Sequence, residues 1–158
     1  MRHLLIPWVL ILMTLPCQAM AATKPDPLCA PLRAFASSVQ PDQTKSLEFH
    51  TSWGGGFKGS DKRTMYEVQC IDHGYAPAKA VCKQLMEQGA VEFSGENAKR
   101  ALVCLSQGTQ FGQNHLQLGQ AEFSFYFGTE QRGSNITMQF QQDPKMGGMV
   151  LSITAEGY

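Results

Sequence analysis

The sequence predicts an α+β domain in which one antiparallel sheet of about five strands packs against about three helices and two disulfides add cross-links. Three observations lead to this fold class. Three segments place apolar residues at helical spacing, and five segments alternate between apolar and polar residues. The last three strand-like segments also follow one another with only turns between them, and this irregular order argues against a parallel α/β sheet.

The first helix is expected to begin at Asp26-Pro27 and to end before Pro41. Aspartate can cap the unpaired amides of a helix start, and proline suits the first helical position. Five apolar residues follow at helical spacing and are expected to face the core: Leu28, Leu32, Phe35, Ala36 and Val39.

Two further helices are expected in the middle of the chain. One begins near Pro77 and ends at Gly89, and the next follows Ser94 and stops before Gly108. The residues expected to face inward are Ala78, Val81, Cys82, Leu85 and Met86 in one, and Ala98, Ala101, Leu102 and Leu105 in the other.

An N-terminal hairpin is predicted between the first two helices. Ser46–Thr51 and Arg63–Cys70 alternate as strands do, and the glycine-rich segment between them forms the turn. After the third helix, His115–Phe127 also alternates, but its phase changes at Gly119-Gln120. A β-bulge at that point would return its apolar residues to one face.

Two more strands complete a C-terminal meander of three. Ser134–Gln141 places Ile136, Met138 and Phe140 on one side, and Met149–Ala155 follows a turn. The sequence therefore predicts an N-terminal hairpin and a three-stranded meander in one sheet.

The N-terminus has the features of a secretory signal peptide. Arg2 supplies a positive charge, Leu4–Leu15 an apolar run, and Ala19–Ala21 the small residues that a signal peptidase reads. We therefore expect residues 1–21 to be a signal peptide that is cleaved after Ala21, and residues 22–158 to form a single exported domain, periplasmic or secreted.

Two alternative interpretations of this N-terminus are weaker. A permanent membrane anchor would need about 20 apolar residues, whereas this run contains Pro7 and ends at Pro16. A lipid-anchored Cys17 would follow a small residue, and here it follows Pro16. No other segment has the length and hydropathy of a membrane span, so the domain is not expected to be embedded in a membrane.

Four cysteines remain after removal of Cys17: Cys29, Cys70, Cys82 and Cys104. An even number in an exported chain predicts two disulfides. Their spacing does not fit a zinc site or a Cys-x-x-Cys redox pair, so no metal is expected. Four cysteines allow three pairings. The predicted helix positions favour Cys70 with Cys82 and Cys29 with Cys104.

The charge balance and the absence of catalytic motifs limit the functional classes. Thirteen basic and thirteen acidic residues give no net charge, which argues against a nucleic-acid partner. No phosphate loop, G-x-S-x-G or H-E-x-x-H is present, and no cofactor is expected. His50, His73 and His115 remain, with Asp72 beside His73, as candidates for a small hydrolase or lyase that uses a histidine and a carboxylate.

The most distinctive stretch is HTSWGGGFKGSDKR, residues 50–63. Trp53 and Phe57 flank three glycines, and Lys58, Lys62 and Arg63 would give the loop a mostly basic rim. Two interpretations of Trp53 stay open. Either Trp53 packs back onto the sheet, or Trp53 or Phe57 projects as an anchor that a partner buries on contact, with Lys58, Lys62 and Arg63 around it.

These features favour a non-enzymatic exported domain that binds another exported protein of unknown identity. An inhibitor or immunity protein against a cell-wall-targeting enzyme has this general build, although a fold by itself does not define a function. The alternatives are the histidine enzyme described above and a carrier that holds a small ligand between sheet and helices.

Overall fold

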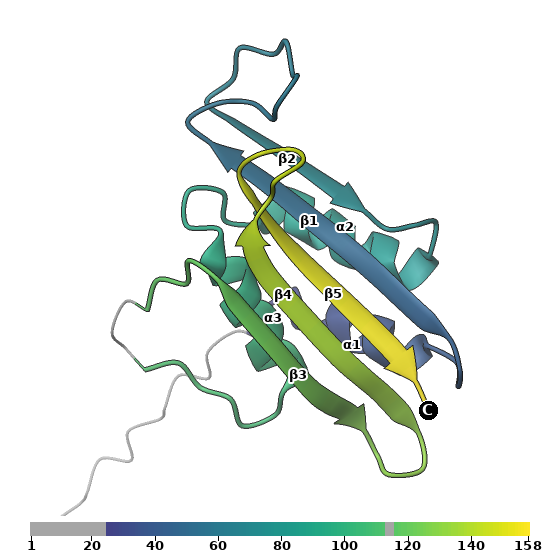
Figure 1. Ribbon diagram of the computed structural model, residues 1–158. Coiled ribbons are helices and arrows are strands. Elements are labelled where there is room, and N and C mark those ends of the chain that lie inside the picture. The colour runs from purple at the N-terminus through teal and green to yellow at the C-terminus, as the bar shows by residue number, and fades with distance from the viewer. Residues whose placement is uncertain (1–24, 113–115) are drawn as a thin grey trace, which may run out of the picture.

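The computed structural model describes residues 25–112 and 116–158 (Figure 1). It contains the helices α1 (Cys29–Ser38), α2 (Ala76–Gln88) and α3 (Gly95–Leu105), and the strands β1 (Thr44–Trp53), β2 (Tyr66–Ile71), β3 (Ala121–Gly128), β4 (Gly133–Gln142) and β5 (Met149–Gly157). The helices cover one face of the sheet, and the predicted α+β fold class is confirmed. The predicted signal peptide, Cys17 and His115 lie outside the described residues.

The five strands form one antiparallel sheet in the order β2-β1-β5-β4-β3. The C-terminal meander therefore occupies one half of the sheet and the N-terminal hairpin the other, as predicted. The two halves meet where β1 pairs with β5, with Leu47 opposite Ile153 and Phe49 opposite Leu151. The last strand along the chain is thus the central strand of the sheet.

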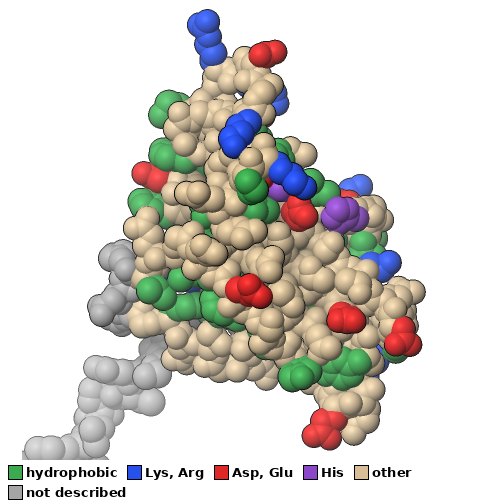
Figure 2. All heavy atoms as spheres, viewed as in Figure 1, with side chains coloured by type: hydrophobic (Ala, Val, Ile, Leu, Met, Phe, Trp, Pro, Cys, Tyr) green, Lys and Arg blue, Asp and Glu red, His purple; other side chains and the backbone are tan. Residues whose placement is uncertain are grey.

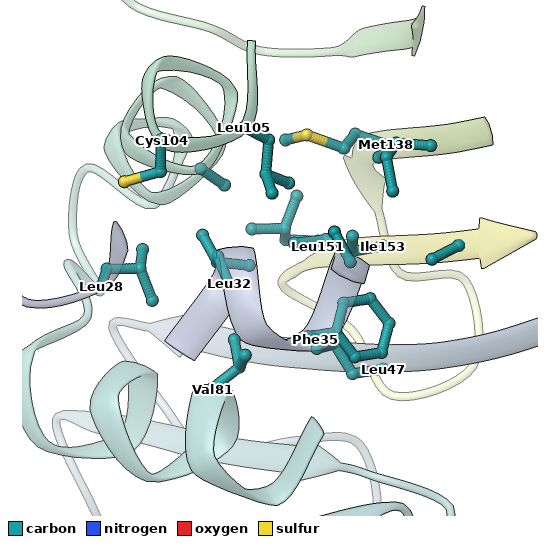
Figure 3. Close-up of a cluster of buried hydrophobic side chains, with 14 of the residues drawn as sticks. Leu28, Leu32, Phe35, Leu47, Val81, Cys104, Leu105, Met138, Leu151 and Ile153 are labelled. Carbon is teal, nitrogen blue, oxygen red and sulfur yellow. The ribbon is translucent and has the colours of Figure 1, made fainter. Parts of the chain in front are cut away.

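The core lies between the sheet and the helices (Figure 3). Leu32 and Phe35 of α1 are fully buried against Leu47 and Ile153, because alternate residues of each strand face the same side. The other face of the sheet carries no helix and bears mainly polar side chains. Among residues 25–112 and 116–158, no further strand pairs with the outer edges of β2 and β3.

Two disulfides fasten helices to the rest of the fold. Cys29–Cys104 joins the start of α1 to α3, and Cys70–Cys82 joins β2 to α2. Both predicted pairings are confirmed. Two disulfides are compatible with an oxidising compartment. No helix within the described ranges has the length and apolar character needed to cross a membrane.

The start of α1 differs slightly from the prediction. The helix begins at Cys29, two residues after the proline, and the Asp26 carboxylate accepts the amide of Leu28 at 2.9 Å. The same carboxylate forms two hydrogen bonds with the guanidinium of Arg100, at 2.6 and 2.9 Å. Hydrogen bonding to Arg100 is the main cause that lowers the pKa of Asp26. The predicted cap therefore also links the start of α1 to α3.

Two other predictions about local structure are wrong. Met86, which was expected to face the core, is 45% exposed. The buried residues of α2 form a narrow stripe whose last member is Leu85. The strand predicted from His115 begins only at Ala121, and no bulge is needed. The described residues before it lie across the start of α3 instead, where the Lys99 ammonium donates to the carbonyl of Leu116 at 2.8 Å.

Candidate functional site

The β1–β2 loop projects beyond the body of the domain, and exposed apolar side chains lie at its base, where β1 ends and β2 begins (Figures 1 and 2). Trp53 at the end of β1 is 51% exposed and stacks on its cross-strand partner Tyr66, with ring centroids 6.5 Å apart. Met65 beside them is also exposed. Of the two interpretations of Trp53, the exposure supports the projecting ring and not the core residue.

Phe57, the second aromatic residue of this loop, has a different position from the one expected of an anchor. Its ring is only 8% exposed, so it packs inward and holds the loop instead of projecting. Its backbone amide donates to the Glu67 carboxylate of β2 at 2.8 Å. That bond is the main cause that lowers the pKa of Glu67, with smaller contributions from Ser60 and Lys62 and with burial opposing them.

The predicted basic rim is only partly available to a partner. The Lys58 amide donates to the carbonyl of Met146 at 2.7 Å, and its ammonium donates to the carbonyl of Pro144 at 2.9 Å. Lys62 lies 3.4 Å from Glu67, on the surface. Arg63 is exposed and has no ion pair with any other described residue. Lys58 therefore fastens the projecting loop to the β4–β5 loop, whereas Arg63 remains accessible.

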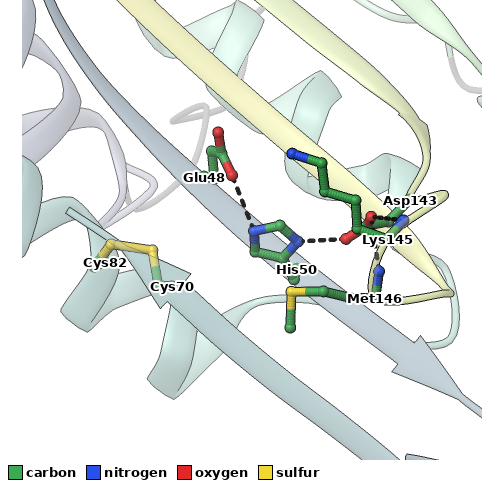
Figure 4. A network of polar contacts seen from close by, with 7 residues as sticks. All are labelled: Glu48, His50, Cys70, Cys82, Asp143, Lys145 and Met146. Atoms are coloured by element: carbon green, nitrogen blue, oxygen red, sulfur yellow. Dashed lines mark hydrogen bonds and ion pairs between the residues drawn. A yellow bond between two sulfur atoms is a disulfide. The ribbon is translucent and has the colours of Figure 1, made fainter. Parts of the chain in front are cut away.

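The β4–β5 loop is itself fixed by a buried pair (Figure 4). Asp143 and His50 are 6% and 5% exposed, and Asp143 Oδ2 lies 2.7 Å from His50 Nδ1. The other carboxylate oxygen accepts the amides of Lys145 and Met146 at 2.8 and 3.0 Å. Because these two residues begin the turn that holds Lys58, the pair connects β1 to the base of the projecting loop.

The charge of Asp143 determines which ring nitrogen of His50 donates a hydrogen bond to it. Burial raises the pKa of Asp143, but hydrogen bonds from Met146, His50 and Lys145 more than offset it, so the pKa lies below its usual value. An ionised carboxylate can only accept hydrogen bonds, so Nδ1 of His50 carries a proton. Nε2 faces the Glu48 carboxylate at 3.2 Å. Both ring nitrogens are thus engaged by carboxylates.

The candidate enzyme residues do not form a recognisable catalytic arrangement within the described ranges. His50 has no hydrogen bond to a serine or cysteine that could act as a nucleophile. His73 is exposed in the β2–α2 turn, and its neighbour Asp72 accepts the amide of Gly74 instead. No cluster of three or more potential metal ligands occurs among the residues that were described.

Two adjacent hollows at this end of the sheet were not foreseen from the sequence. One of about 790 Å³ lies at the start of α3, with an apolar lining that includes Phe93, Leu118 and Phe140. The other, of about 740 Å³, lies between the Trp53 and Lys58 side chains and the β4–β5 loop. The available signal was Phe93, an aromatic residue that lies just before the predicted helix and outside its apolar stripe. In the structure it is exposed.

Comparisons with protein-family models, with curated proteins and with solved structures find no match to this chain.

The lowered pKa of Asp143 gives a testable pH dependence. A carboxylate with a lowered pKa in the folded state contributes stability above its unfolded pKa of about 4, and this contribution is lost as the pH falls through the folded pKa. We expect the amides of Lys145 and Met146 to lose protection from hydrogen exchange below about pH 4. In Asp143→Asn, which cannot ionise, their protection should no longer show this step.

Proposed function

We propose that this chain is an exported, non-enzymatic domain that binds another exported protein through the β1–β2 loop. The observation that carries the proposal is Trp53, an aromatic ring half exposed at the base of a projecting loop. Tryptophan and tyrosine dominate the binding energy of many protein interfaces, and Tyr66 stacks on this ring. The hydrogen bonds of Lys58 and Phe57 hold the loop in one shape, which lowers the entropy lost on binding.

The chemistry of the loop favours an enzyme with an acidic cleft as the partner. Arg63 and Lys62 are exposed and lie within four residues of the exposed Tyr66, and a projecting loop of this kind fits a concave surface. Glycosidases that cut cell-wall polysaccharides carry paired carboxylates in their clefts. We therefore favour an inhibitor or immunity protein against a cell-wall-targeting enzyme, acting in the periplasm or outside the cell.

The larger hollow supports a second candidate, a carrier of a small ligand. Its volume of about 790 Å³ lies within the range of small-molecule sites, and its lining is mostly apolar. It is open at the surface near Phe93 and Leu116, which are both exposed, and so it would also accept a side chain of a protein partner. A protein partner could therefore contact both the Trp53 loop and this hollow.

The proposal is tested with Trp53→Ala and a matched control. Oxidised protein, residues 22–158, is immobilised and offered periplasmic and secreted extracts together with purified peptidoglycan hydrolases, and both retention and inhibition are measured. We expect Trp53→Ala to weaken binding by about 2 kcal/mol or more, which is roughly thirtyfold. Met86→Ala, which removes another exposed apolar side chain from α2, should bind as the wild type does.

Two results would contradict the proposal. If Trp53→Ala lowers the thermal midpoint by many degrees, the ring supports the fold and its exposure does not serve binding. The second result is a wild type that retains no protein and inhibits no hydrolase, while apolar small molecules shift the NMR signals of Phe140 and Met149, which line the larger hollow. That result would favour a carrier of a small ligand.

A further inference from the structure

The outer edge of β3 has a hydrogen-bonding pattern that can be derived residue by residue. Gly133 of β4 exchanges backbone hydrogen bonds with Tyr158, on the side away from β3. Alternate residues of a strand point their N–H and C=O groups to opposite sides, so those of Ser134 point to its β3 partner, Phe127. The residues of β3 whose backbone groups point outward are therefore Glu122, Ser124, Tyr126 and Gly128.

These outward groups have no hydrogen-bond partner among the described residues. Proteins usually protect such an edge with proline, lysine, a bulge or a very short strand. β3 is eight residues long, regular in its pairing with β4, and has only one charged residue, Glu122. The opposite edge strand, β2, has only six residues and is joined to α2 by a disulfide.

The side chains of β3 are also unusually apolar for an edge. Phe123, Phe125 and Phe127 face the helix side and are only partly buried there, and Tyr126 on the other face is 81% exposed. A partner strand on this edge would cover part of each ring and would satisfy the outward backbone groups at the same time.

We propose that the occupant of this edge is a second copy of the same chain, paired antiparallel with β3 about a two-fold axis at Phe125. In this register all four outward residues of each copy bond to the other copy, with about eight hydrogen bonds in total. The pairs are Glu122 with Gly128 of the second copy, and Ser124 with Tyr126 of the second copy.

The same register brings the aromatic residues together. Phe125 lies opposite Phe125 of the second copy, and Phe123 lies opposite Phe127 of the second copy. These are the positions without mutual hydrogen bonds, where facing side chains are closest and aromatic pairs contribute most. A shift by two residues in either direction leaves at least one outward residue of each copy unpaired.

The charges also suit a second copy. Glu122 is the only charged residue of the strand, and antiparallel pairing places it opposite the uncharged Gly128 of the second copy. No like charges face each other within the paired strands. β3 and β2 are opposite edges of the sheet, so this dimer would leave both Trp53 loops accessible, and the inference stands independently of the proposed function.

The first test is the protection of backbone amides from hydrogen exchange, measured by NMR on oxidised wild-type protein at several concentrations. The amides of Phe123, Phe125 and Phe127 bond to β4 and should be protected at every concentration. Those of Ser124 and Tyr126 should be protected only in concentrated samples, with exchange slowing by roughly tenfold or more as the measured mass doubles. Fast exchange of Ser124 and Tyr126 at all concentrations would overturn the proposal.

The second test is Ser124→Pro, with Ser124→Thr as its matched control. The Ser124 amide makes no bond to β4, so proline there should leave the hairpin intact and remove one bond on each side of the two-fold axis. Light scattering should find Ser124→Pro as a monomer and Ser124→Thr as a dimer. A wild type that is monomeric up to its solubility limit, or one that forms larger assemblies, would refute this arrangement.

Should Ser124→Pro fail to fold, Phe125→Cys tests the register directly. A cysteine on the two-fold axis faces the same cysteine of the second copy, and the two should form an intermolecular disulfide under mild oxidation. Tyr126→Cys, one residue away, lies opposite Ser124 of the second copy and should cross-link poorly. Equal cross-linking of both variants, or none of either, would contradict the pairing about Phe125.

Discussion

Replacing Cys29 and Cys104 together with alanine is expected to lower the free energy of unfolding by about 4 kcal/mol. This disulfide joins residues 75 positions apart, and a cross-link that closes a long loop removes much entropy from the unfolded chain. Cys104 is also buried and is bonded to the first residue of α1, so loss of the link loosens the contact between α1 and α3. Urea unfolding of the double variant under oxidising conditions measures the change.

The matched control is removal of the other disulfide. Cys70–Cys82 joins residues 12 positions apart, for which the same relation gives about 3 kcal/mol. The order of the two effects is the decisive observation. If loss of Cys70–Cys82 lowers the free energy of unfolding more, the attachment of β2 to α2 outweighs chain entropy. Loop length would then not explain the stabilisation by Cys29–Cys104.

Replacing Asp143 with alanine is expected to cost about 3 kcal/mol of stability at pH 7. The change leaves the buried Nδ1–H of His50 and the amides of Lys145 and Met146 without their acceptor. The β4–β5 loop should then release Lys58, and with it the base of the Trp53 loop. Chemical unfolding measures the first effect.

Trp53 provides the reporter for the second effect, because it is the only tryptophan in residues 22–158. In Asp143→Ala, the indole ring should become more accessible to soluble quenchers, so its fluorescence should be quenched more strongly than in the wild type. Glu48→Gln is the control, since Glu48 contacts the same imidazole from a more exposed position and its loss should cost under about 1 kcal/mol. If Asp143→Ala and Glu48→Gln lower the free energy of unfolding equally, Asp143 would stabilise the fold through the His50 imidazole and not through the β4–β5 loop.

Most of the fold followed from local patterns in the sequence. Spacing placed the three helices and the inward residues of β4, and the helix positions then selected the correct disulfide pairing. The error at the start of β3 arose from a non-local contact. The alternation seen from Leu116 changes phase at Gly119-Gln120, just before the observed strand begins. The bond from Lys99 holds the segment before that point beside α3, a contact that the sequence pattern does not specify.

The candidate site was less predictable than the fold. The loop and Trp53 stand out by composition, but the side on which each ring lies depends on tertiary contacts, so Phe57 was misplaced. The link between His50 and Asp143 spans 93 positions and brings a strand residue to a distant turn. Neither residue carries a local motif that would connect the two.

The position of β5 in the centre of the sheet also sets the order in which the molecule can assemble. A chain synthesised from its N-terminus presents β1 and β2 long before β5, the strand that joins their hairpin to the rest of the sheet. A two-stranded hairpin alone is only marginally stable in water. Until the last strand emerges, the side of β1 that later pairs with β5 has no hydrogen-bonding partner, so the sheet can be completed only after the C-terminal residues have been made.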